Sequence, residues 1–345
     1  MDGQGQDGWR LSRWSAGAKL VLTLLGWLQG ALPSPHSRFE QAWLLLQIEQ
    51  KGVSVKSSPH FNPDPDAETL YKAMKGIGTN ERAIIDVLTQ RSNAQRQQIA
   101  KSFKAQFGKD LTETLKSELS SNFERLIIAL MYPPYGYEAK ELYDAMKGLG
   151  TREGVINEIL ASRTKNQLRE IMKAYEEDYG SSLEEDIQAD TSGYLERILV
   201  CLLQGSRDDL CGFVDPGLAL KDAQDLYTAG EKICGTDEMK FITILCTRSA
   251  THLMRVFEEY EKIASKSIED SIKSETHGSL EEAMLTVGTH HGTLIRNIIS
   301  RSEIDLNFIK YQFKEMYGKT LSSMIMEDTS SDYKNALLNL VGSDP

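Results

Sequence analysis

Four short glycine-containing loops recur along the chain, and their chemistry suits a hard cation. They are KGIGT at Lys75–Thr79, KGLGT at Lys147–Thr151, KICGT at Lys232–Thr236 and VGT at Val287–Thr289. Glycine lets the backbone turn through positive φ, so several carbonyl oxygens can converge on one point. Calcium takes roughly six to eight oxygen ligands, and backbone carbonyls are among them. The loops therefore predict calcium sites.

Two other residue types keep a constant distance from these loops. When the last glycine of each loop is aligned, an acid follows 40 positions later and an arginine 13 positions later. The aligned glycines are Gly78, Gly150, Gly235 and Gly288, the acids are Glu118, Asp190, Glu275 and Asp328, and the arginines are Arg91, Arg163, Arg248 and Arg301. Such fixed offsets mark a fourfold internal repeat. We interpret the arginines as structural residues that hold helix ends by hydrogen bonds.

The hydrophobic pattern within each unit has a helical period, and no segment alternates as a strand would. We expect about five short helices per unit, with the loop between the first two. The chain leaves the loop along the second helix, crosses by the third and returns along the fourth, so the acid ends beside the loop. In the first unit the ligands would be the carbonyls of Met74, Gly76 and Gly78 with the carboxylate of Glu118.

Such a site is incomplete, because it supplies only about four or five protein oxygens where calcium wants roughly six to eight. Water or a lipid phosphate would complete it, and calcium and membrane binding would then reinforce each other by linkage. A structural alternative exists, since one glycine–threonine loop between two helices also serves as a helix end and a helix start. Similarly, Glu81 and Asp237 either complement a helix dipole or form a minor calcium site.

Composition limits the function classes. The chain has 345 residues, of which 40% are hydrophobic and 26% charged, as in soluble globular proteins. Its formal net charge of -11 argues against a nucleic-acid partner, which requires a basic surface. An anionic membrane would also repel the chain unless a cation reverses the local charge. The four cysteines form no CxxC motif, which favours reduced thiols.

Residues 1–57 form an atypical amino-terminal tail. Residues 10–31 resemble a signal peptide, with three basic residues before the apolar run Leu20–Leu28; a disordered tail is the alternative. The apolar segment Phe39–Ile48 is expected to form a short helix that docks on the body or on a protein partner. Residues 58–66 form a linker. We expect a cytoplasmic, peripheral membrane protein, or an extracellular one if the leader is functional.

The loops KGIGT and KGLGT, the divergent GEKICGT at Gly230–Thr236, the acids and the ending at Asp328–Pro345 resemble the annexin family, and its anticoagulant subgroup in particular. The resemblance covers roughly residues 65–345. It implies an all-α fold of four repeats of about five helices, arranged in a curved disc with the calcium loops on the convex face. The repeats would span residues 67–132, 137–204, 219–287 and 288–345.

The resemblance also implies a ligand set and an activity. The metal ligands would be Met74, Gly76, Gly78 and Glu118; Met146, Gly148, Gly150 and Asp190; and Gly230, Ile233, Gly235 and Glu275. Calcium would bridge these loops to anionic phospholipid such as phosphatidylserine. Shielding of the lipid would then inhibit coagulation and phospholipase action indirectly.

The fourth repeat departs from this pattern. The distance from an acid to the next aligned glycine is 32 residues from Glu118 and 45 from Asp190, but only 13 from Glu275. About twenty residues, including the first helix of the fourth repeat, are therefore missing. Gly288 and Asp328 are doubtful ligands, and the pair His290–His291 is an incidental replacement rather than a metal clip.

Loss of a helix should uncover the neighbouring apolar side chains. We expect Ile295, Ile298 and Ile299 to lose cover, and Ser279–Val287 to substitute in part for the missing helix. The fourth repeat would then be loosened or repacked.

An enzyme, a protein-binding scaffold and a misassembled variant are the three alternatives to a calcium-dependent membrane binder. An enzyme is not expected, because the chain contains no HExxH, GxSxG, GxxxxGK or EF-hand motif. A protein-binding scaffold acting through the amino-terminal tail is the second alternative. A misassembled variant that has lost membrane binding is the third.

Overall fold

The computed structural model describes residues 53–55, 57, 60–148, 150–204, 214–231, 237–276, 278, 280 and 291–344. All regular structure in these ranges is helical, which confirms the expected all-α class. None of the described helices is both long and apolar enough to cross a bilayer. The signal-peptide-like residues 10–31 and the segment Phe39–Ile48 lie outside the described residues.

Repeats 1 and 2 each contain the five predicted helices. Repeat 1 consists of α3 (Pro63–Ala73), α4 (Glu81–Leu88), α5 (Asn93–Phe107), α6 (Leu111–Glu118) and α7 (Ser121–Met131). Repeat 2 consists of α8 (Gly136–Met146), α9 (Glu153–Ser162), α10 (Lys165–Tyr179), α11 (Leu183–Asp190) and α12 (Gly193–Leu203).

Repeats 3 and 4 contribute four described helices each. Repeat 3 has α13 (Pro216–Glu231), α14 (Glu238–Thr247), α15 (Ala250–Ala264) and α16 (Ile268–Glu275). Repeat 4 has α18 (His291–Ser302), α19 (Leu306–Tyr317), α20 (Leu321–Asp328) and α21 (Ser331–Val341). By alignment these four are the second to fifth helices of a unit, so a first helix is missing from the described part of repeat 4.

The residue after each aligned arginine is the N-cap of the third helix in repeats 1 to 3. Thr164 forms a capping box with Gln167, the Gln95 side chain accepts from the backbone N–H of Ser92 at 3.2 Å, and Ser249 caps α15 by accepting a hydrogen bond from the backbone N–H of His252. The third helix ends in all four repeats at a residue in the left-handed conformation: Gly108, Gly180, Ser265 and Gly318. These ends give an independent register for comparing the repeats.

The aligned arginines hold the first helix of their own repeat. Arg91 Nε lies 2.7 Å from a carboxylate oxygen of Asp66, Arg163 Nε 3.4 Å from Glu138, and Arg248 Nε 2.6 Å from Asp222. Each acid lies on the first helix of its unit, so the ion pair ties that helix to the end of the second. This agrees with the structural role inferred from the sequence.

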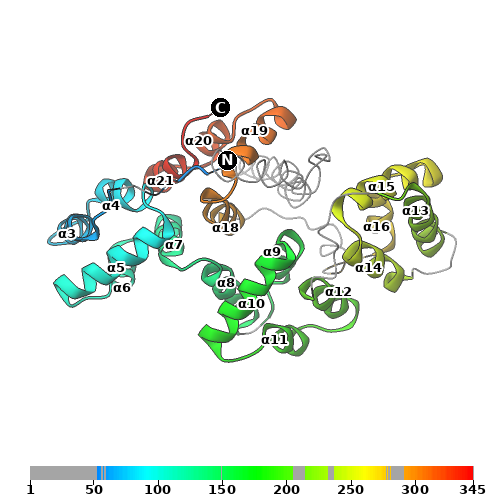
Figure 1. The fold of residues 1–345 in the computed structure, drawn as a ribbon, viewed down its shortest axis with the longest axis horizontal. Helices are drawn as coiled ribbons and strands as arrows, with labels where there is room; N and C mark the ends of the chain where they lie inside the picture. The colour runs from blue at the N-terminus through cyan, green and yellow to red at the C-terminus, as the bar shows by residue number, and fades with distance from the viewer. Residues whose placement is uncertain are drawn as a thin grey trace, which may run out of the picture. The chain divides into compact units, whose positions relative to one another are not determined.

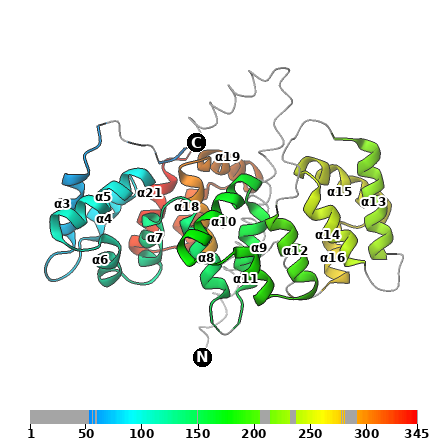
Figure 2. The same cartoon turned by 60° about the horizontal axis from the view of Figure 1, so that its bottom comes forward.

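The chain divides into two compact units. One contains repeats 1 and 4, where α7 packs against α18 and α21 and α4 packs against α21, as Figures 1 and 2 show. The other contains repeats 2 and 3, where α12 packs against α9 and α14. The first unit is therefore built from the two ends of the repeat array.

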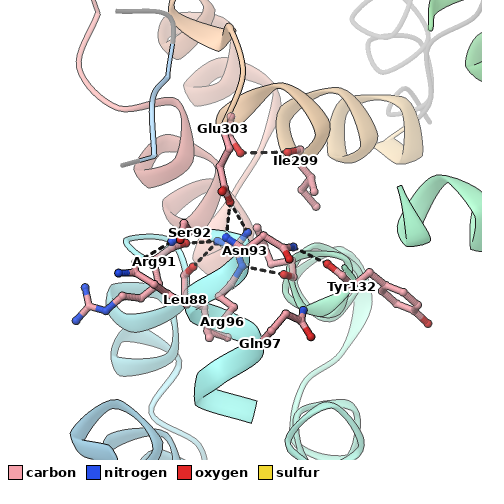
Figure 3. A network of polar contacts seen from close by, with 12 residues as sticks. Leu88, Arg91, Ser92, Asn93, Arg96, Gln97, Tyr132, Ile299 and Glu303 are labelled. Carbon is pink, nitrogen blue, oxygen red and sulfur yellow. Dashed lines mark hydrogen bonds and ion pairs between the residues drawn. The ribbon is translucent and has the colours of Figure 1, made fainter. Parts of the chain in front are cut away.

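A buried arginine joins repeats 1 and 4 (Figure 3). Arg96 is 2% exposed, and it donates hydrogen bonds to the carbonyls of Leu88 and Leu130 at 3.2 and 2.8 Å. Its Nη2 donates to Glu303 Oε1 at 2.8 Å, and the backbone N–H of Asn93 donates to the same oxygen at 2.7 Å. Burial lowers the pKa of Arg96, while the Glu303 charge opposes that change. The carboxylate of repeat 4 thus balances a charge inside repeat 1.

The fourth aligned arginine finds a different partner. With no first helix in the described part of repeat 4, Arg301 pairs with Asp305 four residues later, and its Nε lies 2.6 Å from Asp305 Oδ1. Both residues are buried. Asp305 also precedes α19 at the cap position but makes no cap hydrogen bond with its side chain. The Asp305 carboxylate therefore pairs with Arg301 and does not cap α19.

The expected exposure of the isoleucines was wrong for two of the three. Ile295 and Ile298 are buried, and only Ile299 is partly exposed. They lie on α18, which packs against α7 and α21, so helices from both ends of the chain cover them. Residues 279 and 281–287, which we expected to replace the missing helix, lie outside the described residues.

The buried pair in repeat 4 gives the first prediction. Asp305→Ala should cost about 3–5 kcal/mol, because it leaves the Arg301 guanidinium buried without a counter-ion. Asp66→Ala in repeat 1 is the matched control and should cost less, since the side chain of its arginine partner is 26% exposed. Urea unfolding of both variants measures the difference. If both variants lost the same free energy of unfolding, Asp305 would not be the buried counter-ion that Arg301 requires.

The corresponding pair in repeat 3 gives a pH prediction. Burial raises the pKa of Asp222, but hydrogen bonds and charge from Arg248 and His252 outweigh it, so the pKa lies below its ordinary value. A lowered pKa stabilises the folded state fully above the unfolded value of about 3.9, and this contribution is lost as the pH falls through the folded value. Asp222→Asn should therefore lower the urea midpoint at pH 7, and the difference from the unsubstituted protein should shrink below about pH 4. A difference in urea midpoint that does not change with pH would contradict this prediction.

Candidate functional site

Each intact loop is closed at its base by one backbone hydrogen bond. Asn80 N donates to Ala73 O and Arg152 N donates to Ala145 O, both at 2.8 Å, and Asp237 N donates to Ala229 O at 3.0 Å. The third loop contains one residue more between these ends than the first two. Although its sequence diverges, the third loop is therefore closed by the equivalent backbone hydrogen bond.

The glycines of the first two loops adopt the same unusual backbone conformation. Gly76 and Gly148 have φ of 114° and 108°, and Gly78 and Gly150 have φ of 86° and 88°. A β-carbon at any of these positions would meet no atom within 4 Å, so glycine is required for its φ and not for space. The two loops thus share the same φ values at both matched glycines.

The acid lies against the loop in both repeats. Thr79 Oγ1 donates to Glu118 Oε2 at 2.9 Å, and Thr151 Oγ1 donates to Asp190 Oδ2 at 2.6 Å. Each acid is the last residue of its fourth helix, α6 or α11. Residues 39 positions apart in the sequence are thus in contact, as the expected path of the chain required. The threonine hydroxyl holds the carboxylate at the loop.

A cation and an aromatic column adjoin each loop. Lys75 Nζ lies 5.5 Å from the centroid of the Tyr71 ring, which stacks on Phe107 at 4.0 Å. Lys147 lies 5.1 Å from Tyr143, which stacks on Tyr179 at 3.9 Å. Cation–π attraction therefore places a positive charge beside each loop. In the first loop the apolar side chain of Ile77 is fully exposed.

The third loop is described only at its edges. Gly230 lies in the last turn of α13, where a β-carbon would come within 3.2 Å of the Phe241 ring. Glu275 is the last residue of α16, the position that Glu118 has in α6. Ile233 and Gly235 lie outside the described residues, so their ligand role stays a prediction.

The fourth site is incomplete in the described part of repeat 4. Asp328 is the last residue of α20, like the acids of the other repeats. No first helix precedes α18 there to supply an equivalent of Met74, and Gly288 and His290 lie outside the described residues. The doubt about Gly288 and Asp328 therefore remains.

The donor set of the first two loops fits calcium. Met74, Gly76 and Gly78 in repeat 1, and Met146, Gly148 and Gly150 in repeat 2, can offer carbonyl oxygens, and Glu118 and Asp190 add carboxylates. Hard oxygen ligands of this kind suit calcium better than a transition metal. Sequence reasoning missed the threonine hydroxyl and the lysine over tyrosine. The threonine was present in every loop, and the Tyr–Lys pairs stand four residues apart, the spacing of neighbours on a helix.

Comparison with known families and proteins agrees with this arrangement. The annexin family model matches residues 65–130, 137–202, 221–287 and 279–340. Residues 279–287 are thus matched twice, as the end of the third repeat and as the start of the fourth. Annexin A8 of Bos taurus is 84% identical over 325 residues, which cover 88% of this chain and 99% of that protein. The expected likeness to the anticoagulant subgroup is confirmed, since annexin A8 is also called vascular anticoagulant-beta.

Solved structures give the same result. The structure of the K16A mutant of annexin A8, which has an intact N-terminus, is 83% identical with a TM-score of 0.78, and the match covers 86% of this chain and 99% of that one. Calcium-bound annexin (Sm)1 is 31% identical with a TM-score of 0.67, and the match covers 86% and 97%. Four family matches on four repeats, with relatives over 80% identical, lead to one conclusion: the chain belongs to the annexin family.

Proposed function

We propose that this chain binds anionic phospholipid membranes when calcium bridges its loops to lipid phosphate. The observation that carries the proposal is the common geometry of the first two loops. In both, two glycines of positive φ lie beside an acid that a threonine hydroxyl holds in place. The calcium-bound annexin structure among the similar proteins supports the choice of metal.

Charge explains why calcium is required. The chain carries a formal net charge of -11, so an anionic bilayer repels it. A divalent cation held between carboxylate and phosphate reverses the local sign of this interaction. A loop and one acid supply fewer oxygens than the roughly six to eight that calcium takes, so lipid phosphate completes the shell. Calcium and lipid then raise each other's affinity by the same factor.

The residues beside the loops suit this surface. Lys75 and Lys147 add positive charge next to the metal position, where lipid phosphate would lie. Ile77 exposes an apolar side chain in the middle of the first loop. Both features favour an anionic lipid surface over a protein surface as the partner.

Binding of this kind would cover anionic lipid, phosphatidylserine included. Coverage removes the surface that coagulation factors and phospholipases need, so the chain would inhibit both indirectly, and it would itself catalyse no reaction. The location would be cytoplasmic and peripheral on membranes, or extracellular if residues 10–31 act as a leader.

Replacing the acids tests the bridge. The full chain should sediment with phosphatidylserine vesicles as calcium is raised, and a chelator should release it. Glu118→Gln with Asp190→Asn should raise the calcium midpoint at least about tenfold, since two carboxylate ligands are lost. The matched control is Glu113→Gln on the same helix as Glu118, which should leave the midpoint unchanged.

Other outcomes separate the alternatives. A folded protein that stays in the supernatant at all calcium levels would be a disabled family member whose truncated fourth repeat has abolished binding. Sedimentation with neutral phosphatidylcholine vesicles, or without calcium, would also contradict the bridge. Neither outcome would exclude a scaffold that uses the amino-terminal tail.

The threonine hydroxyls give a second prediction. Thr79→Val with Thr151→Val keeps the side-chain shape but removes the hydrogen bond that orients each acid. Loss of about 0.5–1.5 kcal/mol per hydrogen bond should raise the calcium midpoint roughly two- to tenfold. Serine at both positions keeps the hydroxyl and should restore the original midpoint. A lower midpoint in the valine variant would mean that the hydroxyl competes with calcium for the acid.

A further inference from the structure

Two cysteines lie at the contact between repeats 2 and 3. Cys201 lies on α12 and Cys246 on α14, two helices that pack side by side within one compact unit (Figures 1 and 2). The structure holds both residues as thiols. Cys246 is buried, at 1% exposure, and Cys201 is partly exposed. We call these two residues the α12–α14 thiols.

The sulfur of Cys246 reaches the backbone of α12 next to Cys201. Cys246 Sγ lies 3.9 Å from the carbonyl oxygen of Ile198. On an α-helix the residue at i+3 lies one turn above residue i on the same face, and Cys201 is three residues after Ile198. Cys201 therefore adjoins the point on α12 that the Cys246 sulfur contacts.

A second contact identifies the side of α12 that faces α14. Arg197 Nη1 donates a hydrogen bond to Met239 Sδ at 3.2 Å, and Met239 lies in the first turn of α14. Arg197 precedes Cys201 by four residues, so the two side chains share one face of α12. The contacts of Arg197 and Ile198 thus place the Cys201 face toward α14.

The spacing of packed helices suits a disulfide between them. Helix axes in contact lie about 8–10 Å apart, and each Cα lies about 2.3 Å from its own axis. Facing residues can thus bring their Cα atoms within the roughly 4.4–6.8 Å that a disulfide spans. A bond between Cys201 and Cys246 is therefore compatible with the packing of α12 on α14.

The packing of these helices does not itself require sulfur. Aligned on the repeat glycines, Ala129 of repeat 1 stands at the position of Cys201, and Ile299 of repeat 4 at that of Cys246. Their helices, α7 and α18, also pack on each other. The equivalent contact in the other unit therefore holds two aliphatic side chains, and the thiols are a local feature of repeats 2 and 3.

The surroundings of Cys201 favour reaction with a peroxide. Cys201 is partly exposed and Cys246 is buried, so a small oxidant meets Cys201 first. Arg197 lies one turn before Cys201 on α12, and a nearby guanidinium favours the thiolate, the form that attacks peroxides. Cys246 then lies on the side from which a second thiol can resolve the oxidised sulfur.

We propose that Cys201 and Cys246 form a peroxide-responsive disulfide that joins repeat 2 to repeat 3. The Cys201 sulfur attacks one peroxide oxygen, the O–O bond breaks, and Cys201 becomes a sulfenic acid while its former proton leaves with the other oxygen as water. The Cys246 sulfur then attacks the Cys201 sulfur, the S–O bond breaks, and the Cys246 proton leaves with that oxygen as a second water. The two thiols together give two electrons to one peroxide.

The bond joins the supports of two candidate calcium sites. α12 begins shortly after Asp190, the acid of the second loop, and α14 begins directly after Asp237, whose amide closes the third loop. A disulfide also restricts the unfolded chain, so it stabilises the folded state. We therefore expect the oxidised protein to have a higher urea midpoint than the reduced protein.

Peptide mapping of the full chain tests the bond. Reduced protein is treated with hydrogen peroxide in small excess, without calcium or lipid, and is digested without reductant. Mass spectrometry should find a peptide with Cys201 linked to a peptide with Cys246, lighter than the separate peptides by two hydrogen atoms. Dithiothreitol should separate the two peptides again.

Single substitutions separate the two steps. Cys246→Ser should leave the Cys201 sulfenic acid unresolved, so that dimedone labels Cys201. Cys201→Ser should leave Cys246 unlabelled, because Cys246 is buried. Peroxide should raise the urea midpoint of the parent protein reversibly and that of neither variant. Both variants keep Met239, so a shift caused by methionine oxidation would appear in them as well. Circular dichroism checks that each variant is folded.

Three results would overturn the proposal. A linked peptide that joins Cys201 or Cys246 to Cys211 or Cys234 means that another pair of thiols reacts. A link found only in a dimer on a non-reducing gel means that the bond joins two copies. Recovery of both thiols after Met239 has been oxidised means that no disulfide forms. Because the measurement needs neither calcium nor membrane, it can fail while the proposed membrane function holds.

Discussion

The pairing of the aligned arginines with carboxylates is the constraint on which the repeat architecture depends: Arg163 and Arg301 are buried, and Arg91 and Arg248 are partly exposed. Arginine does not give up its proton in proteins, so a buried arginine must find an acid. In repeats 1 to 3 that acid lies on the first helix, and the ion pair fastens this helix to the second. The loop between the same two helices is the candidate calcium site. The structural pairs therefore hold the carbonyl oxygens where the proposed function needs them.

The fourth repeat shows how firmly this constraint acts. Its described part lacks the first helix, yet Arg301 remains buried and pairs with Asp305, an acid that would otherwise cap the next helix. The charge is thus satisfied locally, without a first helix in the described part of the repeat. A buried arginine requires only a nearby carboxylate, whereas the calcium sites proposed for repeats 1 and 2 require two helices joined by a particular turn.

Much of the fold and of the candidate site could be predicted from the sequence, because local patterns determine the helices and the loops. Helical periodicity and two constant offsets predicted the helices of repeats 1 and 2 and the approach of Glu118 and Asp190 to their loops. Contacts between distant repeats could not be read in this way. Ile295 and Ile298 looked uncovered because α7, which lies in repeat 1, gives no local signal of its packing on α18. The use of Asp305 by Arg301 likewise depends on a helix that the described part of repeat 4 lacks.

The joining of repeats 1 and 4 into one compact unit also has a consequence for biosynthesis. Arg96 leaves the ribosome 207 residues before its partner Glu303, a delay of roughly 10–40 s at about 5–20 residues per second. During that time α4 and α7 lack the apolar surfaces of α18 and α21, and a buried charge lacks its counter-ion. Repeats 2 and 3 form a unit that is contiguous in sequence and can close first. The apolar surfaces of repeat 1 that α18 and α21 cover therefore stay exposed until those two helices have been made.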